Sequence, residues 1–268
     1  MNKPLKIASI GPYLPFRGGI SDFHRDLIKQ LKISNDVEII NFKKLYPNLL
    51  FPGKSQTINE YPNSNNESKR ILNPLNIFSW ISAVQFINKF NAEIIIISYW
   101  HPFFALMYSF IAKNIKCKKI YFLMHNAESH DHFPLEKFLV KSMLKQATHI
   151  VFMNDKERNK IASFNLQGKI INSFHPIYLK KFNELDRRNY KSDLGLNQQP
   201  VILFFGLIRP YKGLDILIDT VNLIKNSIPE LKVLVVGESY MSMKKYHLQI
   251  QKYNLKDFFI FNNSFVSE

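Results

Sequence analysis

Short apolar runs alternate with segments of helical periodicity along most of the chain. The runs are rich in isoleucine, valine and phenylalanine, which is typical of strands buried on both faces of a parallel sheet. Between them, apolar residues recur every three or four positions, which predicts amphipathic helices. The predicted strands are Lys6–Ile10, Val37–Phe42, Glu93–Ser98, Lys119–Met124, His149–Met153 and Lys169–Phe174, and the predicted helices are Ile20–Leu31, Phe103–Ala112, Leu135–Gln146 and Asp155–Phe164.

This alternation favours a doubly wound parallel α/β sheet with right-handed crossovers. The polar stretch Asn59–Arg70 interrupts the alternation and predicts a surface loop. The charged segment Lys180–Gln199 suits an interdomain connection with one short helix. Further predicted strands follow it at Val201–Phe205, Lys232–Val236 and Phe258–Phe261. We therefore expect one Rossmann-like domain over residues 1–180 and a second over 181–268, which has so few strands that we expect it to be incomplete.

The first strand of the second domain runs into a turn that contains glycine and two cations. Gly206 ends the apolar run, Arg209 and Lys212 follow, and Gly213 precedes a helical pattern. Such a turn lies at the carboxyl edge of a parallel sheet, where open α/β folds bind ligands and where a helix N-terminus attracts anions. Arginine can hold two phosphate oxygens and lysine adds a mobile charge, so the turn suits a diphosphate. The alternative is a pair of solvated loop cations on a basic protein.

Composition limits the class of protein. The 268 residues contain 46% hydrophobic residues, carry a net charge of +15 and include a single cysteine, Cys117. One cysteine excludes an internal disulfide and a cysteine-based zinc cluster, and it fits a reducing cytoplasm. No apolar segment is long enough to span a bilayer, and the N-terminus reads as a first strand rather than a signal peptide.

The positive charge fits a nucleic acid, an anionic lipid or a phosphorylated substrate. Nucleic acid is the least favoured partner, because the sequence has no zinc finger, aromatic RNA-binding signature or clear helix-turn-helix. Lys137, Lys141 and Lys145 form a cationic stripe beside Phe138, which suits peripheral contact with an anionic membrane. An ordinary lysine-rich solvent face of a helix explains the same pattern.

Several segments together resemble a known family over nearly the whole chain: retaining glycosyltransferases of the GT-B fold, in glycosyltransferase family four, also called group 1. The resemblance implies two Rossmann-like domains, with the acceptor on the first and the nucleotide sugar on the second. The matching segments are Gly11-Pro12-Tyr13 with Arg17-Gly18-Gly19-Ile20, Ile94–Ile97 with Ser98-Tyr99-Trp100-His101-Pro102, Phe122–Asn126, Gly206–Gly213 and Val235–Glu238.

The sequence departs from the family pattern in two places. Leu207 follows the glycine of the phosphate turn where the family usually has arginine, and the arginine here is Arg209. The family's paired glutamates would follow Glu268, so we expect the donor domain to be truncated in this sequence. Donor ribose binding and domain closure depend on that region.

The resemblance implies the site residues. His125, Arg209 and Lys212 are the catalytic candidates. Donor binding is implied for Gly18, Gly19, Gly206, Arg209, Lys212, Gly213, Gly237 and Glu238, and acceptor contact for Trp100 and His101. A histidine satisfied at a strand end explains His125 equally well without the resemblance. Glu238 also suits the start of a helix.

The implied reaction moves a sugar from a UDP- or GDP-linked donor to a saccharide or lipid-linked acceptor with retention, in cell-envelope or exopolysaccharide synthesis. The expected location is cytoplasmic, with peripheral membrane contact open. No cofactor and no metal are expected; His130 and His132 resemble a zinc cluster in composition only. Two alternatives stay open. One is an inactive binding module for nucleotide or acceptor, and the other is a basic nucleic-acid or membrane-surface protein on a Rossmann-like scaffold.

Overall fold

The computed structural model describes residues 3–47, 55–58, 67–126, 135–176, 184–196, 198–239 and 241–266. These residues divide into two compact units, one holding those up to 176 and the other those from 184. Each unit has its own parallel sheet and its own hydrophobic core. The units are therefore described one at a time.

The first unit is built on a seven-stranded sheet in the order β3-β2-β1-β4-β5-β6-β7, with every neighbouring pair parallel. Its central strands carry fully buried side chains such as Ile10, Ile97 and Phe122. This confirms the predicted doubly wound sheet, because the strand order reverses beside β1. The strands are β1 (Lys6–Ile10), β2 (Asp36–Phe42), β3 (Lys69–Leu72), β4 (Ile94–Tyr99), β5 (Lys119–Met124), β6 (His149–Phe152) and β7 (Lys169–Asn172).

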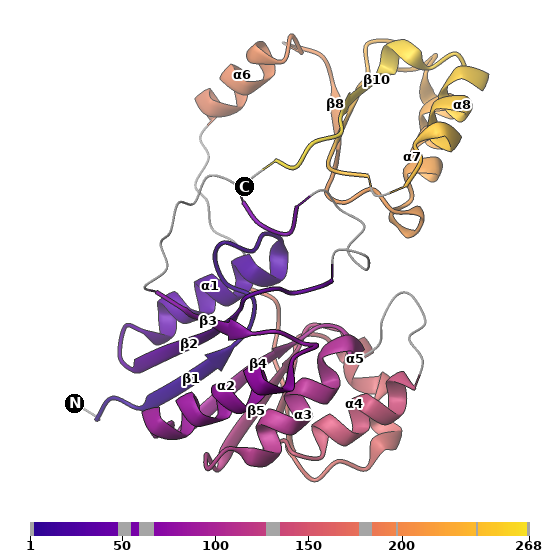
Figure 1. Ribbon diagram of the computed structural model, residues 1–268. Helices are drawn as coiled ribbons and strands as arrows, with labels where there is room; N and C mark the ends of the chain where they lie inside the picture. Colours follow the sequence, from indigo (N-terminus) through magenta and orange to yellow (C-terminus); the bar gives the residue numbers. More distant parts are fainter. Residues whose placement is uncertain are drawn as a thin grey trace. The chain divides into compact units, whose positions relative to one another are not determined.

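Helices cover the two faces of this sheet unequally. α2 (Ile77–Phe90), α3 (Ala105–Asn114) and α4 (Glu136–Leu144) pack against one another in a row along the sheet (Figure 1). Their buried side chains join the largest core cluster, whereas those of α1 (Gly19–Leu31) join separate clusters. Right-handed crossovers put α1 on the opposite face from α2. A short α5 (Asp155–Lys160) follows β6, and no helix in the described ranges is long and apolar enough to cross a membrane.

Three elements differ from the sequence predictions. The helix predicted over Asp155–Phe164 ends at Lys160 as α5, and a 3-10 turn follows over Ala162–Phe164. β3 begins at Lys69, so the predicted loop is wrong at Lys69 and Arg70, while residues 59–66 lie outside the described ones. Helix α2 was not predicted, because apolar side chains surround most of its circumference and give no clear stripe. The other strands of this unit are confirmed to within two residues at each end.

The second unit has a three-stranded parallel sheet in the order β10-β9-β8. Register pairing puts Leu203, Leu234 and Ile260 in one row across the sheet, and Ile202, Val233 and Phe259 in the next row, on the other face. The elements are α6 (Glu184–Asp193), β8 (Val201–Phe205), α7 (Leu214–Ile224), β9 (Lys232–Val236), α8 (Lys244–Lys252) and β10 (Phe259–Asn262), which confirms the short helix expected before Val201.

Only one face of this sheet is covered by helices within the described residues. Ile202, Val233 and Phe259 belong to the core cluster that includes side chains of α7 and α8. On the opposite face Leu203 is 57% exposed and Ile260 is 37% exposed. Parallel sheets normally have both faces covered, so this apolar face is the unusual feature of the second unit.

We predict that substitutions on the two faces of this sheet reduce the free energy of unfolding by different amounts. Ile218→Ala removes a fully buried side chain from α7 and should lower the free energy of unfolding by about 2–5 kcal/mol. Leu203→Ala on the uncovered face should cost about 1 kcal/mol or less. Urea denaturation of the two variants measures the difference, and equal losses would contradict the asymmetry.

Candidate functional site

The turn between β8 and α7 is fixed to the turn that follows β9. The Gly206 N–H donates to the Val236 carbonyl at 2.9 Å, and the Ile208 N–H donates to the Glu238 carbonyl at 2.9 Å. The Ile208 side chain is fully buried in the core of the second unit. Arg209 follows this anchor directly, so its backbone position is set by the residue before it.

Gly206 and Gly237 meet backbone to backbone. Gly237 has φ 144°, and a Cβ built on it would overlap the carbonyl oxygen of Gly206. Gly206 itself has φ 109°, in the region that side chains disfavour. No other residue type fits at Gly237, and the two turns consequently lie in direct contact at the carboxyl edge of the sheet.

Arg209 and Lys212 both lie in the turn just before helix α7. Arg209 is half-buried and extended, and it precedes a short 3-10 turn over Pro210–Lys212. Lys212 is exposed, with its Nζ 5.6 Å from the centroid of the Tyr211 ring. Gly213, with φ 77°, caps α7 without a side-chain hydrogen bond. Backbone N–H groups at such an N-terminus are available to an anion.

The first turn of α7 also carries a carboxylate. The Asp215 Oδ2 lies 2.9 Å from the Nζ of Lys245 on α8. The hydrogen bond to Lys245 lowers the pKa of Asp215. The structure thus gathers Gly206, Arg209, Lys212, Gly213, Gly237 and Glu238 in two adjoining turns, and their role in binding a donor stays a prediction.

In the first unit, Gly18 and Gly19 form the start of α1. Gly18 has φ 104°, and its carbonyl accepts hydrogen bonds from the N–H groups of Ser21 and Asp22. A Cβ at either glycine would meet no atom of the described residues within 4 Å. The positive φ favours glycine at position 18, and the described residues leave the space beside this helix start open.

A buried histidine that sequence reasoning missed holds the first loop in place. The Nε2 of His24 lies 2.7 Å from Ser9 Oγ, and its Nδ1 lies 3.0 Å from the Pro12 carbonyl. Burial lowers the pKa of His24 to about 4, so the neutral ring donates from Nδ1 to Pro12 and accepts from Ser9. A Cβ on Gly11 would lie 2.7 Å from this ring. The only sequence signal was its position beside Phe23 on the apolar side of α1.

His125 lies in a histidine–aromatic cluster at the end of β5. Its N–H donates to the Tyr99 carbonyl at 2.9 Å, and its ring centroid is 5.1 Å from that of Phe23. His175 contacts the same Phe23 ring at 5.2 Å. Burial, followed by the charges of His175 and His24, lowers the pKa of His125 to about 3. Its Nε2 is buried and has no hydrogen-bond partner in the part of the chain the structure describes.

Trp100 and His101 make structural contacts. Trp100 is 8% exposed, and its Nε1 donates to Tyr46 Oη at 2.9 Å. The Nδ1 of His101 accepts from the Phe103 N–H at 3.2 Å, which caps a 3-10 turn over Pro102–Phe104. Core packing and capping account for both residues, and acceptor contact by them stays a prediction.

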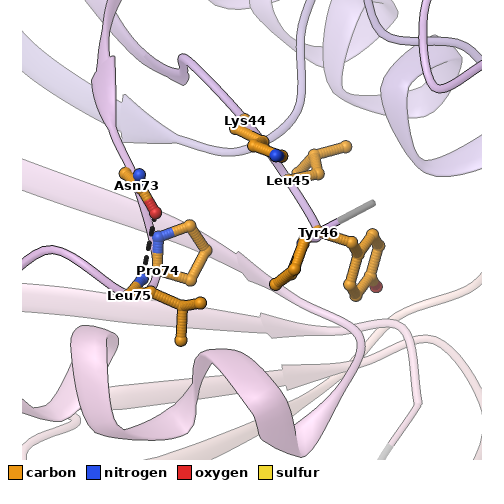
Figure 2. Close-up of a pocket in the computed structure, with 7 residues that line it drawn as sticks. Lys44, Leu45, Tyr46, Asn73, Pro74 and Leu75 are labelled. Carbon is orange, nitrogen blue, oxygen red and sulfur yellow. Dashed lines mark hydrogen bonds between the residues drawn. The ribbon is translucent and has the colours of Figure 1, made fainter. Parts of the chain in front are cut away.

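A shallow pocket lies next to this aromatic group. Figure 2 shows Lys44, Leu45 and Tyr46 on one side of it and Asn73, Pro74 and Leu75 on the other. The first segment follows β2 and the second follows β3. Tyr46 belongs both to the pocket and to the hydrogen bond from Trp100. Leu45, which also lines the pocket, belongs to the main core cluster, so both residues connect the pocket to the core.

No group of three or more histidine, cysteine, aspartate or glutamate residues that could hold a metal occurs among the described residues. His130 and His132 lie outside them. The expectation that no metal is needed is therefore untested.

Two buried neutral histidines predict a pH dependence of stability. The pKa is about 4 for His24 and about 3 for His125 in the folded protein, against 6.5 as the ordinary value. The unfolded chain binds more protons below pH 6.5, so the free energy of unfolding should fall as the pH drops from 6.5 to 4.

His125→Gln removes one of these groups. The variant's slope of unfolding free energy against pH should be shallower than that of the wild type by up to about 1.4 kcal/mol per pH unit. Urea denaturation at several pH values measures both slopes. Equal slopes would mean that folding does not lower the pKa of His125.

Comparison with known proteins finds a family model that matches part of the chain and a fold shared by nearly all of it. Residues 186–264 match the family model described as Glycosyl transferases group 1. No curated protein matches the sequence. The matched segment contains both turns of the second unit, including Arg209, Lys212 and Glu238.

Solved structures with a GT-B fold match nearly the whole chain at low sequence identity. The Anabaena protein HepE, in complex with UDP and glucose, has TM-score 0.70 and 16% identity over 96% of this chain and 68% of its own. Sucrose-phosphate synthase from Thermosynechococcus elongatus has TM-score 0.69 and 17% identity over 97% of this chain and 71% of its own. WaaG, described as a glycosyltransferase involved in lipopolysaccharide biosynthesis, has TM-score 0.59 and 13% identity over 96% of this chain and 69% of its own. The parallel-sheet, Rossmann-like fold of the GT-B class is therefore confirmed.

Proposed function

We propose that this chain is a glycosyltransferase that takes a sugar from a nucleotide-diphosphate donor. The observation that carries the proposal is the family match over residues 186–264, which includes every donor-binding candidate of the second unit. HepE, with a similar fold, binds UDP and glucose. These similarities support a nucleotide-sugar donor, and UDP and GDP are the nucleotides to test.

The chemistry needed at the second unit is stabilisation of a leaving diphosphate. Negative charge grows on the diphosphate as the glycosidic bond breaks, and fixed positive groups lower the barrier. Arg209 is suited to holding two phosphate oxygens, while Lys212 and the N-terminus of α7 add further positive charge. We propose that these groups suffice without a metal ion.

The first unit supplies the candidate for contact with the transferred sugar. The buried Nε2 of His125 has no hydrogen-bond partner in the described part of the chain, so it retains one hydrogen bond for a sugar hydroxyl. We propose that the reaction retains the anomeric configuration by front-face attack, without a covalent carboxylate. The proposed acceptor is a saccharide or a lipid-linked molecule in cell-envelope polysaccharide synthesis. The proposed location is the cytoplasmic side of the membrane. Trp100 and His101 are proposed to support the acceptor side through their packing.

A second candidate is a nucleotide-binding module without turnover. The face of the β8–β10 sheet that no described helix covers, where Leu203 is 57% exposed, favours it. This candidate shares the diphosphate site and differs only in catalysis.

Nucleotide binding is the direct test. Saturating UDP or GDP should raise the melting temperature by about 5 °C, and Lys212→Ala should remove most of that shift. Lys256→Ala is the matched control, because Lys256 is exposed at the amino end of β10, on the opposite edge of the sheet. Differential scanning fluorimetry measures all three proteins.

The results separate the candidates. No shift with any nucleotide, or an equal shift in Lys212→Ala and the wild type, would contradict the proposed donor site. A shift without release of nucleotide from its sugar conjugate during long incubation with candidate acceptors would favour the binding module.

A further inference from the structure

The start of helix α2 exposes a group of large apolar side chains. Leu75 is 68% exposed, Ile77 48%, Phe78 75% and Ile81 38%. They follow one another over less than two helical turns, so they form one surface that we call the α2 tip. Exposed apolar groups of this size mark interaction sites on soluble proteins.

The core does not need these side chains. Helix α2 buries Ala83 and Ile87, and Trp80, Val84 and Phe86 pack against the same cluster. The α2 tip lies outside this inward face, which is why the helix has no clear apolar stripe. Its apolar residues are additional to those that fold the unit.

The backbone holds the α2 tip rigidly. The Asn76 side chain accepts from the Phe78 N–H at 3.0 Å and caps the helix. Trp80 Nε1 donates to the Asn73 carbonyl at 2.9 Å, and Ser79 Oγ donates to the same carbonyl at 3.0 Å. The exposed side chains are thus presented by an anchored turn.

Positive charge lies beside the α2 tip. Lys43 and Lys44 are exposed, and Lys44 shares the pocket of Figure 2 with Leu75. No aspartate or glutamate occurs between Glu67 and Glu93 in the sequence, a stretch that contains α2 entirely. The surface therefore combines apolar side chains with cations and carries no nearby carboxylate from its own helix.

The neighbouring helices α3 and α4 also expose apolar side chains, and α4 exposes a lysine beside one of them. Because α2, α3 and α4 follow parallel strands, their N-terminal ends lie toward one edge of the sheet. Leu106 on α3 is 61% exposed and Phe138 on α4 is 70% exposed. Lys137 next to Phe138 is also exposed, so part of the cationic stripe predicted from the sequence flanks an apolar residue at this edge.

We propose that the α2 tip, with Lys43 and Lys44, docks on an anionic membrane surface. Leu75, Ile77, Phe78 and Ile81 would enter the interfacial region, and the lysines would pair with lipid phosphates. Charge complementarity identifies the occupant: the chain carries +15, and nucleic acid would leave the four apolar side chains without a partner. The proposal does not depend on nucleotide binding in the second unit.

The test is sedimentation with vesicles of phosphatidylglycerol and phosphatidylcholine, compared with phosphatidylcholine alone. The wild type should bind the anionic vesicles, and Leu75→Ser/Phe78→Ser should bind at least about tenfold more weakly. The Lys43→Gln/Lys44→Gln variant should bind anionic vesicles about fivefold more weakly for each lysine replaced, and this difference from the wild type should be smaller in high salt. Circular dichroism and the nucleotide shift establish that each variant is folded.

Matched controls distinguish binding through the α2 tip from nonspecific binding by other exposed apolar or cationic residues. Ile33 is 75% exposed and Leu223 is 81% exposed, so Ile33→Ser/Leu223→Ser removes equally exposed apolar groups elsewhere. Lys29→Gln/Lys32→Gln removes two exposed lysines from the end of α1, on the other face of the sheet. Both controls should bind as the wild type does.

Three results would overturn the proposal. The first is wild-type protein that binds neither vesicle, and the second is a Leu75→Ser/Phe78→Ser variant that binds as the wild type does. The third is analytical ultracentrifugation showing that this variant turns a wild-type dimer into a monomer while vesicle binding is unchanged, which would make the α2 tip a contact between copies.

Discussion

Parallel strand pairing is the constraint on which the other features depend. In each unit every strand-to-helix turn must leave the sheet at its carboxyl edge. Residues distant in the sequence, such as Arg209 and Glu238, consequently meet in neighbouring turns, and His125 ends the strand beside the one that leads to Trp100. The topology alone therefore brings the candidate site residues of each unit to the carboxyl edge of its sheet.

Much of the fold was predictable because its strands are continuous apolar runs. β1, β5, β8 and β9 have the predicted bounds, since such a run leaves little ambiguity at its ends. The turn with Gly206 and Gly213 was equally legible, because both have positive φ, which glycine adopts most easily. Helix α2 was not legible, because periodicity detects an inward face only where the outward face is polar.

The first-unit cluster shows a different limit. Phe23 lies in a helix that the sequence predicts, yet the sequence gives no reason to place His125 and His175 against its ring. The hydrogen bonds of His24 to Ser9 and Pro12 depend on tertiary contacts that no local pattern encodes. Trp100, for which acceptor contact stays a prediction, is largely enclosed by the core, and the sequence gives no sign of this burial. Local rules fail most often where side chains from several elements converge.

The contact between Gly206 and Gly237 links two loops that would otherwise move separately. With no side chains between them, and with hydrogen bonds on both sides of the contact, neither turn can shift without displacing the other. A ligand that touches both turns meets two loops whose relative position is already fixed, so little of its binding free energy is lost in ordering them. The two glycines thus preorganise the two turns of the second unit relative to each other.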